Sequence, residues 1–563
     1  MPAVGSEVEV TLGPWSHVYD SGDPGGATPE SLVDAFNMVD LDHFRGSAQV
    51  ARHGIVGLTT QLGASDAART GQGIFFHRRR DGRIDRFTFG GGKMYSWDGL
   101  NTFTDITPVG IEISSTNPIF CASFSGEVLV SDEKNKPWVY TPETGAAATL
   151  QFNAANDEWT TKGGAGVFSG YNVFIVRAVG TALLQAETGD YLTTEDGSRL
   201  LTELLSGEQN TIAWGEPFDP RLGYDQANYD HTWELTQTSN ELLGGLFAEE
   251  GGLVYLRNTG IGILTGAVDD NWRNSATRDA ISNTIGTDAP AAIVSANKRV
   301  FFLDMDGRPY MMVVGGGEPT PLWLPLRREV QSNFGSASNR ANVVSYGRAA
   351  HHPEYDIVLF TIWDRTTLYG FDAQTGQYIG QWEVLGGVHV DAMGALLDDN
   401  SRMTFCLLGT RGTSYTESAK GVFWRQKHSS DTSQWLDQAD ASVGTHTSFT
   451  RRVETHYAAH QAARQLRVDR VVAELLGDTS AHAVRLQYKR PGATYSTALS
   501  AQSTATTGGF DDTDAIALAR WSPGRNAQGS SLRLRVSATH SDNVRFGIHR
   551  LTMHGRITEL RPK

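Results

Sequence analysis

The stretch FFLDMDGRPYMM places Asp304 and Asp306 directly ahead of Gly307. Alternating acidic residues before a glycine are typical of EF-hand calcium loops, which need oxygen ligands at loop positions 1, 3 and 5 and a glutamate at position 12. With Gly307 at position 6, Phe302 and Val313 take positions 1 and 12, and neither side chain ligates a hard cation. Asp-Gly between two apolar runs is instead typical of a tight hairpin turn, and we predict a β-hairpin here.

A second cluster of ligand-type residues, HHPEYD, contains His351, His352, Glu354 and Asp356. A metal ion needs ligands that converge in space, and the turn at Pro353 makes close neighbours splay apart. We therefore interpret this cluster as the loop that leads into the strand DIVLFTIW.

Two further histidines, His456 and His460, have the i, i+4 spacing of a helical zinc site. Tyr457 stands where a zinc protease of this type needs its glutamate. Even if this segment forms a helix, the sequence favours ordinary surface or interface histidines over a metal site.

The glycine-rich stretches also lack residues that nucleotide-binding loops require. FGGGKM has the Gly-Lys of a phosphate loop, but Met94 replaces the magnesium-binding Ser/Thr and Phe87 replaces the first glycine. GIGILTG has one residue too many for a dinucleotide fingerprint, and no Gly-x-Ser-x-Gly elbow is present. A pair of glycosidase carboxylates stays open as an alternative, because the separation of Asp and Glu side chains in space is invisible in sequence. We expect no enzyme activity, no cofactor and no metal.

The densest basic cluster is HRRRDGRIDR, with Arg78, Arg79, Arg80, Arg83 and Arg86 around an Asp-Gly turn. Such a cluster can bind phosphates or an acidic neighbouring chain, or it can be the solvated rim of a hairpin. No aromatic residues interleave the arginines, as binding of single-stranded nucleic acid would favour. The pattern therefore favours a protein contact over nucleic acid.

The elements that must position these residues are short strands. From about residue 74, aromatic and β-branched runs alternate with Gly, Asp-Gly and Thr-Gly turns. Related units recur every 45 to 64 residues, marked by a series of tyrosines: Tyr95, Tyr140, Tyr191, Tyr255, Tyr310, Tyr369 and Tyr415. Repeats of this length made of strands alone predict the blades of a large β-propeller, with six or seven irregular blades over residues 65–425.

Other segments flank or interrupt the predicted propeller. Residues 1–64 are polar and indicate an irregular lead-in arm, with one short helix near PESLVDAFNMV. Residues 181–209 indicate a hairpin insertion, and residues 426–450 a Ser/Thr/Asp-rich linker.

Residues 451–563 show a second β pattern. VRLQYKR and SLRLRVSA alternate apolar and basic residues, which is typical of strands with one buried face. NVRFGIHRLTMHGRI changes phase near His549–Arg550, which predicts a β-bulge. We predict a separate antiparallel β-sandwich. The fold class is therefore all-β, a propeller followed by a C-terminal sandwich.

Composition excludes several classes of protein. No window of 18 apolar residues predicts a membrane helix, and the first residues lack the basic and apolar regions of a signal peptide. The two cysteines, Cys121 and Cys406, exclude a disulfide scaffold and favour buried thiols made in a reducing cytoplasm. The net charge of −15 is uneven: residues 441–563 hold 17 Lys+Arg against 9 Asp+Glu, and residues 1–440 hold 31 against 54. The acidic residues 1–440 should repel nucleic acid unless a local basic patch is present.

The segment DAFNMVDLDHFRGSAQVARHGIVGLTTQLGASDAARTGQGIFF resembles the start of the tail nozzle, or head-to-tail stabilisation, proteins of short-tailed bacteriophages. The positions that carry the resemblance are an Asn, an Arg-x-Gly turn, a Gly and an Arg-Thr-Gly step into the first propeller strand: Asn37, Arg52, Gly54, Gly63, Arg69, Thr70 and Gly71. His53 replaces the usual proline. Looser echoes follow in residues 170–180, 210–223, 284–312 and 520–537.

The resemblance implies a non-catalytic virion protein, made in the host cytoplasm and located in the tail. It implies a homo-hexameric ring below the portal and adaptor proteins, with fibre or tip proteins beneath it. Genomic DNA would pass through the lumen without sequence-specific binding, and the protein would not insert into a membrane. An acidic lumen would let DNA slide without adhering.

Arginines of the predicted propeller and sandwich are the candidate protein-interface residues: Arg78, Arg79, Arg80, Arg83, Arg451, Arg452, Arg533 and Arg535. The alternative function is a propeller that binds or cleaves carbohydrate, for which carboxylates and aromatic residues should gather at the central mouth. A third possibility, a bacterial surface or scaffold propeller, fits less well because no export signal is present.

Overall fold

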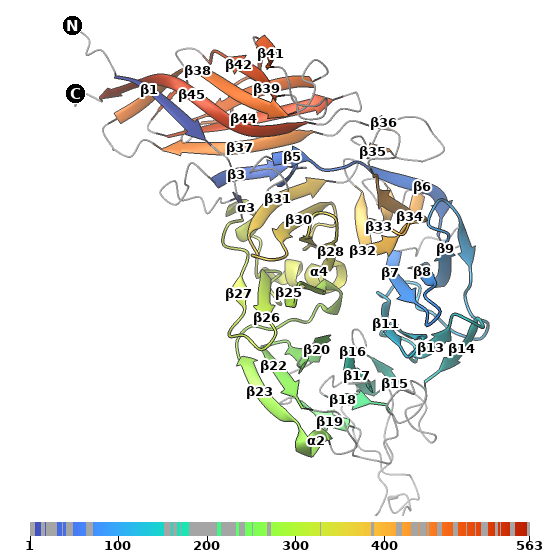
Figure 1. Cartoon of the computed structure of the whole chain (residues 1–563). Coiled ribbons are helices and arrows are strands. Elements are labelled where there is room, and N and C mark those ends of the chain that lie inside the picture. The colour runs from blue at the N-terminus through green and yellow to red at the C-terminus, as the bar shows by residue number, and fades with distance from the viewer. Residues whose placement is uncertain are drawn as a thin grey trace, which may run out of the picture.

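Short antiparallel strands joined by tight turns make up most of the protein, as the turn-rich sequence predicts (Figure 1). This computed structural model describes residues 6–12, 17–18, 31–36, 38–40, 49–62, 71–150, 159–161, 166–168, 171–178, 211–215, 232–235, 243–249, 252–266, 272–326, 328–383, 388–411, 419–428, 437–438, 446–447, 450–458, 464–476, 482–490, 493–501, 503–507, 516–523, 527–529, 531–540 and 546–559.

Seven antiparallel sheets among the described residues follow one another around a ring, so the propeller has seven blades (Figure 1). The first three blades are formed by β7 (Gly71–Arg78), β8 (Ile84–Gly90), β9 (Lys93–Trp97) and β10 (Phe103–Asp105); by β11 (Phe120–Phe124), β12 (Glu127–Ser131), β13 (Trp138–Thr141) and β14 (Ala146–Thr149); and by β15 (Trp159–Thr161), β16 (Gly166–Phe168), β17 (Tyr171–Ala178), β18 (Thr211–Trp214) and β19 (Thr232–Glu234).

The next three blades continue the ring. They are formed by β20 (Leu243–Glu249), β21 (Gly252–Arg257), β22 (Gly260–Thr265) and β23 (Thr277–Ser282); by β24 (Ile293–Ala296), β25 (Arg299–Leu303), β26 (Pro309–Val313) and β27 (Thr320–Pro321); and by β28 (Arg348–His352), β29 (Ile357–Thr361), β30 (Thr367–Asp372) and β31 (Tyr378–Glu383). Short helices connect some strands: α2 (Trp272–Ser275), η2 (Pro290–Ala292), α3 (Arg328–Gln331) and α4 (Ala337–Tyr346).

The seventh blade closes the ring with a strand from the other end of the propeller sequence. Its strands β32 (His389–Leu397), β33 (Met403–Arg411) and β34 (Ala419–Gln426) are followed in the sheet by β6 (Ile55–Gln61). Ile55 pairs with Gln426, and Val56 with Arg425. The outer strand of the last blade therefore precedes the first blade in sequence. Its backbone hydrogen bonds with β34 close the ring.

Glycines allow the innermost strands to approach their neighbours near the centre of the ring. A Cβ atom at Gly244 would lie 1.8 Å from the carbonyl oxygen of Thr287, and one at Gly71 would lie 2.5 Å from the Cβ of Leu408. A larger residue at either position would force the blades apart.

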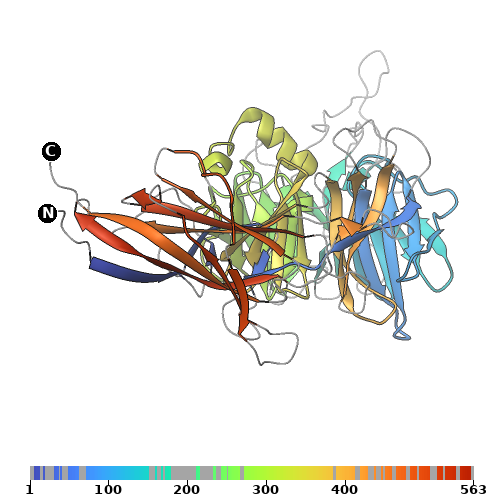
Figure 2. The ribbon, with the colours of Figure 1, turned by 90° about the horizontal axis from the view of Figure 1, so that it is seen from above.

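The C-terminal region contributes to a β-sandwich, as predicted, and the sandwich is attached at the rim of the ring (Figures 1 and 2). It is not the separate unit of residues 451–563 that we expected, because strands from residues 6–51 belong to it and one of its sheets continues into the sixth blade. Its first layer, here called the terminal sheet, contains β1 (Ser6–Leu12), β4 (Met38–Asp40), β5 (Gln49–Ala51), β38 (Arg464–Leu476), β41 (Ser503–Thr507), β42 (Ile516–Trp521), β43 (Gln528–Gly529) and β45 (Gly547–Glu559). In β45 the partners of Glu474 and Leu475 are Arg550 and Ile548, so His549 is the extra residue of the predicted β-bulge.

The second layer continues directly from the sixth blade. This shared sheet runs from β31 through β3 (Ser31–Phe36), β37 (Arg451–Ala458), β44 (Ser531–His540) and β39 (His482–Lys489) to β40 (Leu499–Ser500), with β2 (His17–Val18) beside β3. One continuous apolar core also contains residues of both regions, including Phe360 and Phe371 of the propeller and Leu534 and Leu551 of the sandwich. The propeller and the sandwich are therefore joined by backbone pairing and by side-chain packing.

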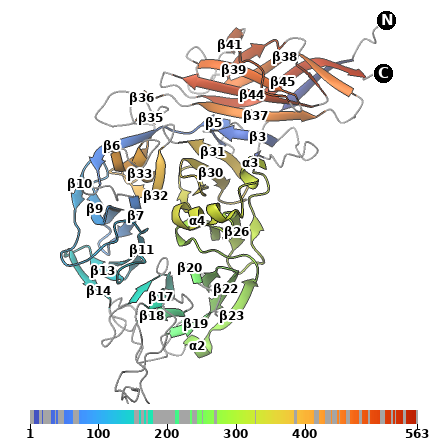
Figure 3. The same ribbon diagram turned by 180° about the vertical axis from the view of Figure 1, so that it is seen from behind.

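The described parts of residues 1–62 differ from the irregular arm that we expected. The helix predicted near PESLVDAFNMV is instead β3, which pairs with β37 in antiparallel and with β31 in parallel orientation. β1 pairs with β45 along its whole length, from Ser6–Ile557 to Leu12–Leu551 (Figure 3). Neighbouring strands overrode the local helix pattern, because the backbone hydrogen bonds of this segment are supplied by the sandwich and the sixth blade.

The predicted linker contains two short strands among its described residues. β35 (Asp437–Gln438) pairs with β36 (His446–Thr447), and Gln438 also pairs with Val56 of β6. The hairpin insertion predicted over 181–209 lies outside the described residues.

Candidate functional site

The arginine cluster of the first blade lies on the turn between β7 and β8, with Gly82 at φ 86°. Arg79 donates two hydrogen bonds to Asp85, at 2.6 and 2.7 Å. This hydrogen bonding raises the pKa of Arg79. Arg80 donates to the carbonyl and hydroxyl oxygens of Ser125, at 2.6 and 2.8 Å, and so reaches the second blade.

Other arginines of the cluster divide between internal and exposed roles. Arg86 donates to the backbone oxygens of Leu397 and Asp398 in the seventh blade. Arg83 is exposed, with its guanidinium 3.4 Å from Asp81, and Arg78 is exposed at the end of β7. The cluster therefore joins neighbouring blades through Arg80 and Arg86, and it presents Arg78 and Arg83 to solvent.

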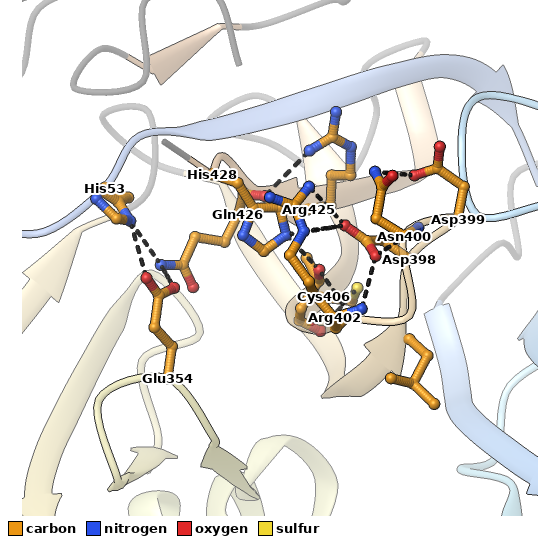
Figure 4. Close-up of polar contacts among 12 residues, drawn as sticks. His53, Glu354, Asp398, Asp399, Asn400, Arg402, Cys406, Arg425, Gln426 and His428 are labelled. Carbon is orange, nitrogen blue, oxygen red and sulfur yellow. Dashed lines mark hydrogen bonds and ion pairs between the residues drawn. The ribbon is translucent and has the colours of Figure 1, made fainter. Parts of the chain in front are cut away.

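Asp398, on the turn between β32 and β33, gathers several of these contacts (Figure 4). Its buried carboxylate accepts hydrogen bonds from the backbone N–H groups of Asn400 and Arg402, at 2.9 and 2.8 Å. The Arg402 guanidinium lies 2.9 Å away, and the Nε2 atom of His428 lies 3.4 Å away. All of these partners hold the turn in place, and they leave the carboxylate little capacity to act on a substrate.

A second contact in Figure 4 links the lead-in segment to the sixth and seventh blades. Gln426 donates to the Glu354 carboxylate at 2.8 Å, and His53 Nδ1 lies 3.4 Å from the same carboxylate. Burial opposes ionisation of Glu354, but hydrogen bonding and charge from His53 outweigh it and lower the pKa. Nearby His352 is buried between aromatic rings, and burial lowers its pKa to about 3, so it is neutral.

In the HHPEYD cluster, His351 and His352 end strand β28, and residues 353–356 form the turn into β29. The loop interpretation is therefore confirmed for the last four residues and wrong for the two histidines. His351 Nε2 lies 2.9 Å from Asp356, and that carboxylate also accepts hydrogen bonds from Asn297 and Gln374. Asp356 thus connects the fifth and sixth blades. Within the described part of the chain, no group of three or more His, Cys, Asp or Glu residues is arranged to hold a metal ion.

Near the inner strands, Asp391 of β32 contacts two neighbouring blades. It forms an ion pair with Arg365 and accepts a hydrogen bond from the backbone of Gly71 at 3.3 Å. Its own backbone oxygen accepts from Arg348 at 2.6 Å. Burial lowers the pKa of Arg365 to about 10, and the guanidinium lies 4.7 Å from the centre of the Tyr346 ring. This inner-strand carboxylate therefore ties blades together.

The sequence-based interpretation of several single residues is confirmed. In the turn that contains Asp306 and Gly307, Asp304 donates its N–H to Arg308, and the Gly307 N–H donates to Asp304, as a hairpin requires. Cys121 and Cys406 lie in strands, and burial raises the pKa of both thiols. Only Cys406 is fully buried as predicted, since Cys121 is partly exposed.

The histidine pair does not lie on a helix. His456 belongs to strand β37, and His460 lies outside the described residues. The helical i, i+4 arrangement considered for a zinc site is therefore wrong at His456.

The junction between propeller and sandwich contains a buried ion pair that sequence reasoning missed. Arg52 donates two hydrogen bonds to Asp437, both at 2.9 Å, and both side chains are 1% exposed. The Asp437 carboxylate also accepts from the backbone of Ile55 at 2.8 Å. Arg52 itself carries part of the phage resemblance, but nothing in the sequence indicated Asp437 as its partner.

Arg451 belongs to the same junction, which corrects its assignment as an interface residue. Its side chain is fully buried, so it is not presented to a partner. Burial, with the nearby charge of Arg52, lowers its pKa to about 10, and Asp437 opposes this shift.

The remaining candidate arginines lie on the shared sheet. Arg535 donates to Glu454 at 2.6 Å, and Arg452 lies 3.5 Å from the same carboxylate. Arg533 is half-buried on the neighbouring part of β44. These residues, unlike Arg451, lie on the face of the sheet that points away from the sandwich core.

No helix among the described residues is long and apolar enough to span a membrane. No family model matches the sequence, and no curated protein matches it.

Solved structures match about two thirds of the chain at low similarity. The computationally designed Ika8 protein shares 14% identity over 66% of this chain and 98% of its own, with a TM-score of 0.34. The Cps50 (Swd1) β-propeller domain of Myceliophteria thermophila shares 11% identity over 65% and 98%, with a TM-score of 0.37. U3-55K shares 10% identity over 66% and 98%, with a TM-score of 0.39. These low scores carry no functional argument, and the sheets themselves define the fold.

Proposed function

We propose that the chain is a non-catalytic structural protein of a bacteriophage virion, a nozzle or tail-hub component of a short-tailed phage. The observation that carries the proposal is the order of the parts. A lead-in segment, a propeller and a C-terminal sandwich occur in the order that the sequence resemblance implies.

The positions that carry the resemblance support the proposal because the described ones have architectural roles. Arg52 forms the buried ion pair at the junction, and Gly54 accepts a hydrogen bond from the backbone of Lys427 at 2.8 Å. Gly71 lets β7 pack against Leu408. The resemblance therefore lies at positions that hold the fold together. Such a pattern is expected between proteins that share a structural role and have no catalytic residues in common.

The rigid connection between propeller and sandwich also supports a structural role. A tail component must keep its orientation when DNA leaves the particle, and a shared sheet with a continuous core resists hinge motion. In the proposed role, copies of the chain form a ring below the portal and adaptor proteins and carry fibres or a tip. The acidic residues 1–440 would limit adhesion of DNA passing through the lumen.

The proposal is tested on particles of a phage that carries this gene. We expect mass spectrometry to find the chain in purified virions, and antibody labelling to place it at the tail. The purified chain should form rings in light scattering and negative-stain images. A chain absent from the virion would overturn the proposal, and glycan-array binding with hydrolysis of the bound glycan would favour the carbohydrate alternative.

A further inference from the structure

Strand alternation gathers basic side chains on one face of the shared sheet. In β39, Val484 and Leu486 are buried in the sandwich core, so Arg485, Gln487 and Lys489 point to the opposite side. In β44, Leu532, Leu534 and Val536 are buried in the same way, and Arg533 and Arg535 alternate with them along the strand.

The strand register brings these residues side by side. Arg485 is opposite Ser537, Gln487 is opposite Arg535, and Lys489 is opposite Arg533. On the other side of β44, Arg452 is opposite Ser537 and Glu454 is opposite Arg535. The outward positions therefore form a basic face, defined by Arg452, Arg485, Lys489, Arg533 and Arg535.

Glu454, the acidic residue within this face, is enclosed by donors. It is 1% exposed, and its carboxylate accepts hydrogen bonds from Arg535 at 2.6 Å and from the Tyr495 hydroxyl at 2.7 Å. Tyr495 also covers the guanidinium, with 3.8 Å between Cζ of Arg535 and the ring centre. An approaching partner therefore meets cations, while the buried carboxylate holds Arg535 in a fixed position.

Neighbouring like charges on a sheet repel each other, as Lys489 and Arg533 do across β39 and β44. The outward positions of β39 and β44 carry cations and no acidic residue, and Glu454 of β37 is enclosed by its donors. Arg485 is exposed and Lys489 is half-exposed, so the face is open to a partner along β39.

We propose that the basic face is a docking surface for the acidic propeller of a second copy of this chain. Charge complementarity selects this occupant, because residues 52–440, which contain the propeller, hold 46 Asp+Glu against 30 Lys+Arg, whereas the exposed side chains of the basic face are cations. Sandwich-to-propeller contact joins two different surfaces, so it can propagate from copy to copy and close into a ring. The inference names the contact within the proposed tail assembly and rests on that proposal only for its biological setting.

The test compares two double variants of the full chain in sedimentation velocity and light scattering, at low and high salt. Arg485→Glu with Lys489→Glu reverses the charge of the basic face. Arg470→Glu with Arg520→Glu is the matched control, since it makes the same change of net charge at exposed positions of the terminal sheet. Thermal unfolding checks that each variant is folded, and Arg485→Gln with Lys489→Gln replaces the first variant if it is not.

We expect the wild type and the control to self-associate with similar dissociation constants. The variant of the basic face should bind at least tenfold more weakly, and added salt should weaken wild-type association because it screens the charges. A wild type that is monomeric at low salt, or an equal loss in both variants, would overturn the inference.

A fluorescent duplex DNA fragment distinguishes another occupant. If DNA binds the wild type and competes with self-association, and the basic-face variant loses both, the face serves nucleic acid and the inference is wrong. The outcome is separable from the proposed function: a monomeric protein found in phage tails would overturn only the docking surface, and self-association of a chain absent from virions would overturn only the tail role.

Discussion

Aspartates in tight turns account for part of the acidity of the propeller. Each accepts hydrogen bonds from backbone N–H groups of the following residues, which lets the chain reverse direction with its donors satisfied. The aspartates with such bonds include Asp98, Asp132, Asp304, Asp364, Asp372 and Asp398. A negative charge that we first related to DNA passage thus also has a local structural cause.

The turn aspartates predict a loss of stability in acid. At Asp98 burial opposes ionisation, but backbone hydrogen bonds from Thr102 and Leu100 outweigh it and lower the pKa. Burial also opposes ionisation of Asp105, but hydrogen bonds from Lys93 and then from Thr107 outweigh it and lower the pKa. At Asp356, burial is outweighed by side-chain hydrogen bonds, and the pKa is again lowered. Their stabilisation is present above the unfolded pKa of about 4 and is lost as pH falls through the lower folded values. Urea midpoints should therefore drop steeply below about pH 4.

Asp304 should behave in the opposite way, because burial raises its pKa to about 6. Between about pH 4 and 6 the folded state holds a proton that the unfolded state has released, so this group lowers stability as pH rises. Asp304→Asn keeps an oxygen acceptor for the turn and removes the charge. We expect it to be more stable than the wild type by on the order of 1–3 kcal/mol at pH 8, and by little at pH 4. Urea unfolding at both pH values tests this, and an equal loss of stability at both would contradict it.

Removing one partner of the buried pair Arg52–Asp437 should lower the free energy of unfolding more than replacing both partners. Asp437→Asn leaves the Arg52 charge uncompensated near Arg451, which should cost roughly 3–5 kcal/mol. Arg52→Met combined with Asp437→Asn removes that charge as well, so the double variant should be more stable than Asp437→Asn alone. Chemical denaturation of both variants measures the difference, and additive losses would argue against coupling between the two residues.

At the scale of elements, the lead-in segment and the propeller approach each other closely where β3 meets β31. Gly380 has φ 130°, and a Cβ atom there would lie 2.3 Å from the carbonyl oxygen of Ala35. The pairing that links the sixth blade to the sandwich therefore depends on a residue without a side chain.

Gly380→Ala should destabilise the protein by at least about 3 kcal/mol, because a left-handed backbone penalty adds to a clash with backbone. Gly82→Ala is the matched control: Gly82 also has positive φ, at 86°, but nothing lies within 4 Å of the added Cβ. It should cost only about 1–2 kcal/mol. Equal losses in urea unfolding would show that β3 shifts to accommodate the methyl group.

Local patterns in the sequence predicted elements well. The Asp306–Gly307 turn, the alternation of Leu532 and Leu534, and the bulge at His549 are all present, because each depends on neighbouring residues alone. The propeller was predicted from repeats of these units.

Long-range partners were the part that the sequence could not predict. β3 was predicted as a helix because its hydrogen-bond partners lie in β31 and β37. Arg451 was assigned to the surface because nothing local reveals that Arg52 and Asp437 surround it. The sequence also did not distinguish six blades from seven, because the strand that completes the seventh blade precedes the first blade in the chain.

The whole molecule should unfold as one unit despite its two regions. The core that contains Phe360 also contains Leu534, and the strands of the lead-in segment pair with both regions. We expect one calorimetric transition, with the calorimetric and van't Hoff enthalpies in agreement. Two transitions, or early loss of the sandwich in limited proteolysis, would contradict this, because separable domains open independently.

The closure of the seventh blade by β6 has a consequence for synthesis on the ribosome. β6 leaves the exit tunnel long before its partner β34 has been translated. The interval between synthesis of β1 and of its partner β45 is longer still. Six blades can therefore assemble while the chain grows, yet the ring stays open at one edge until translation is nearly complete. During that interval the unpaired edges are open to wrong partners, and nascent chains on one messenger RNA are the nearest ones available.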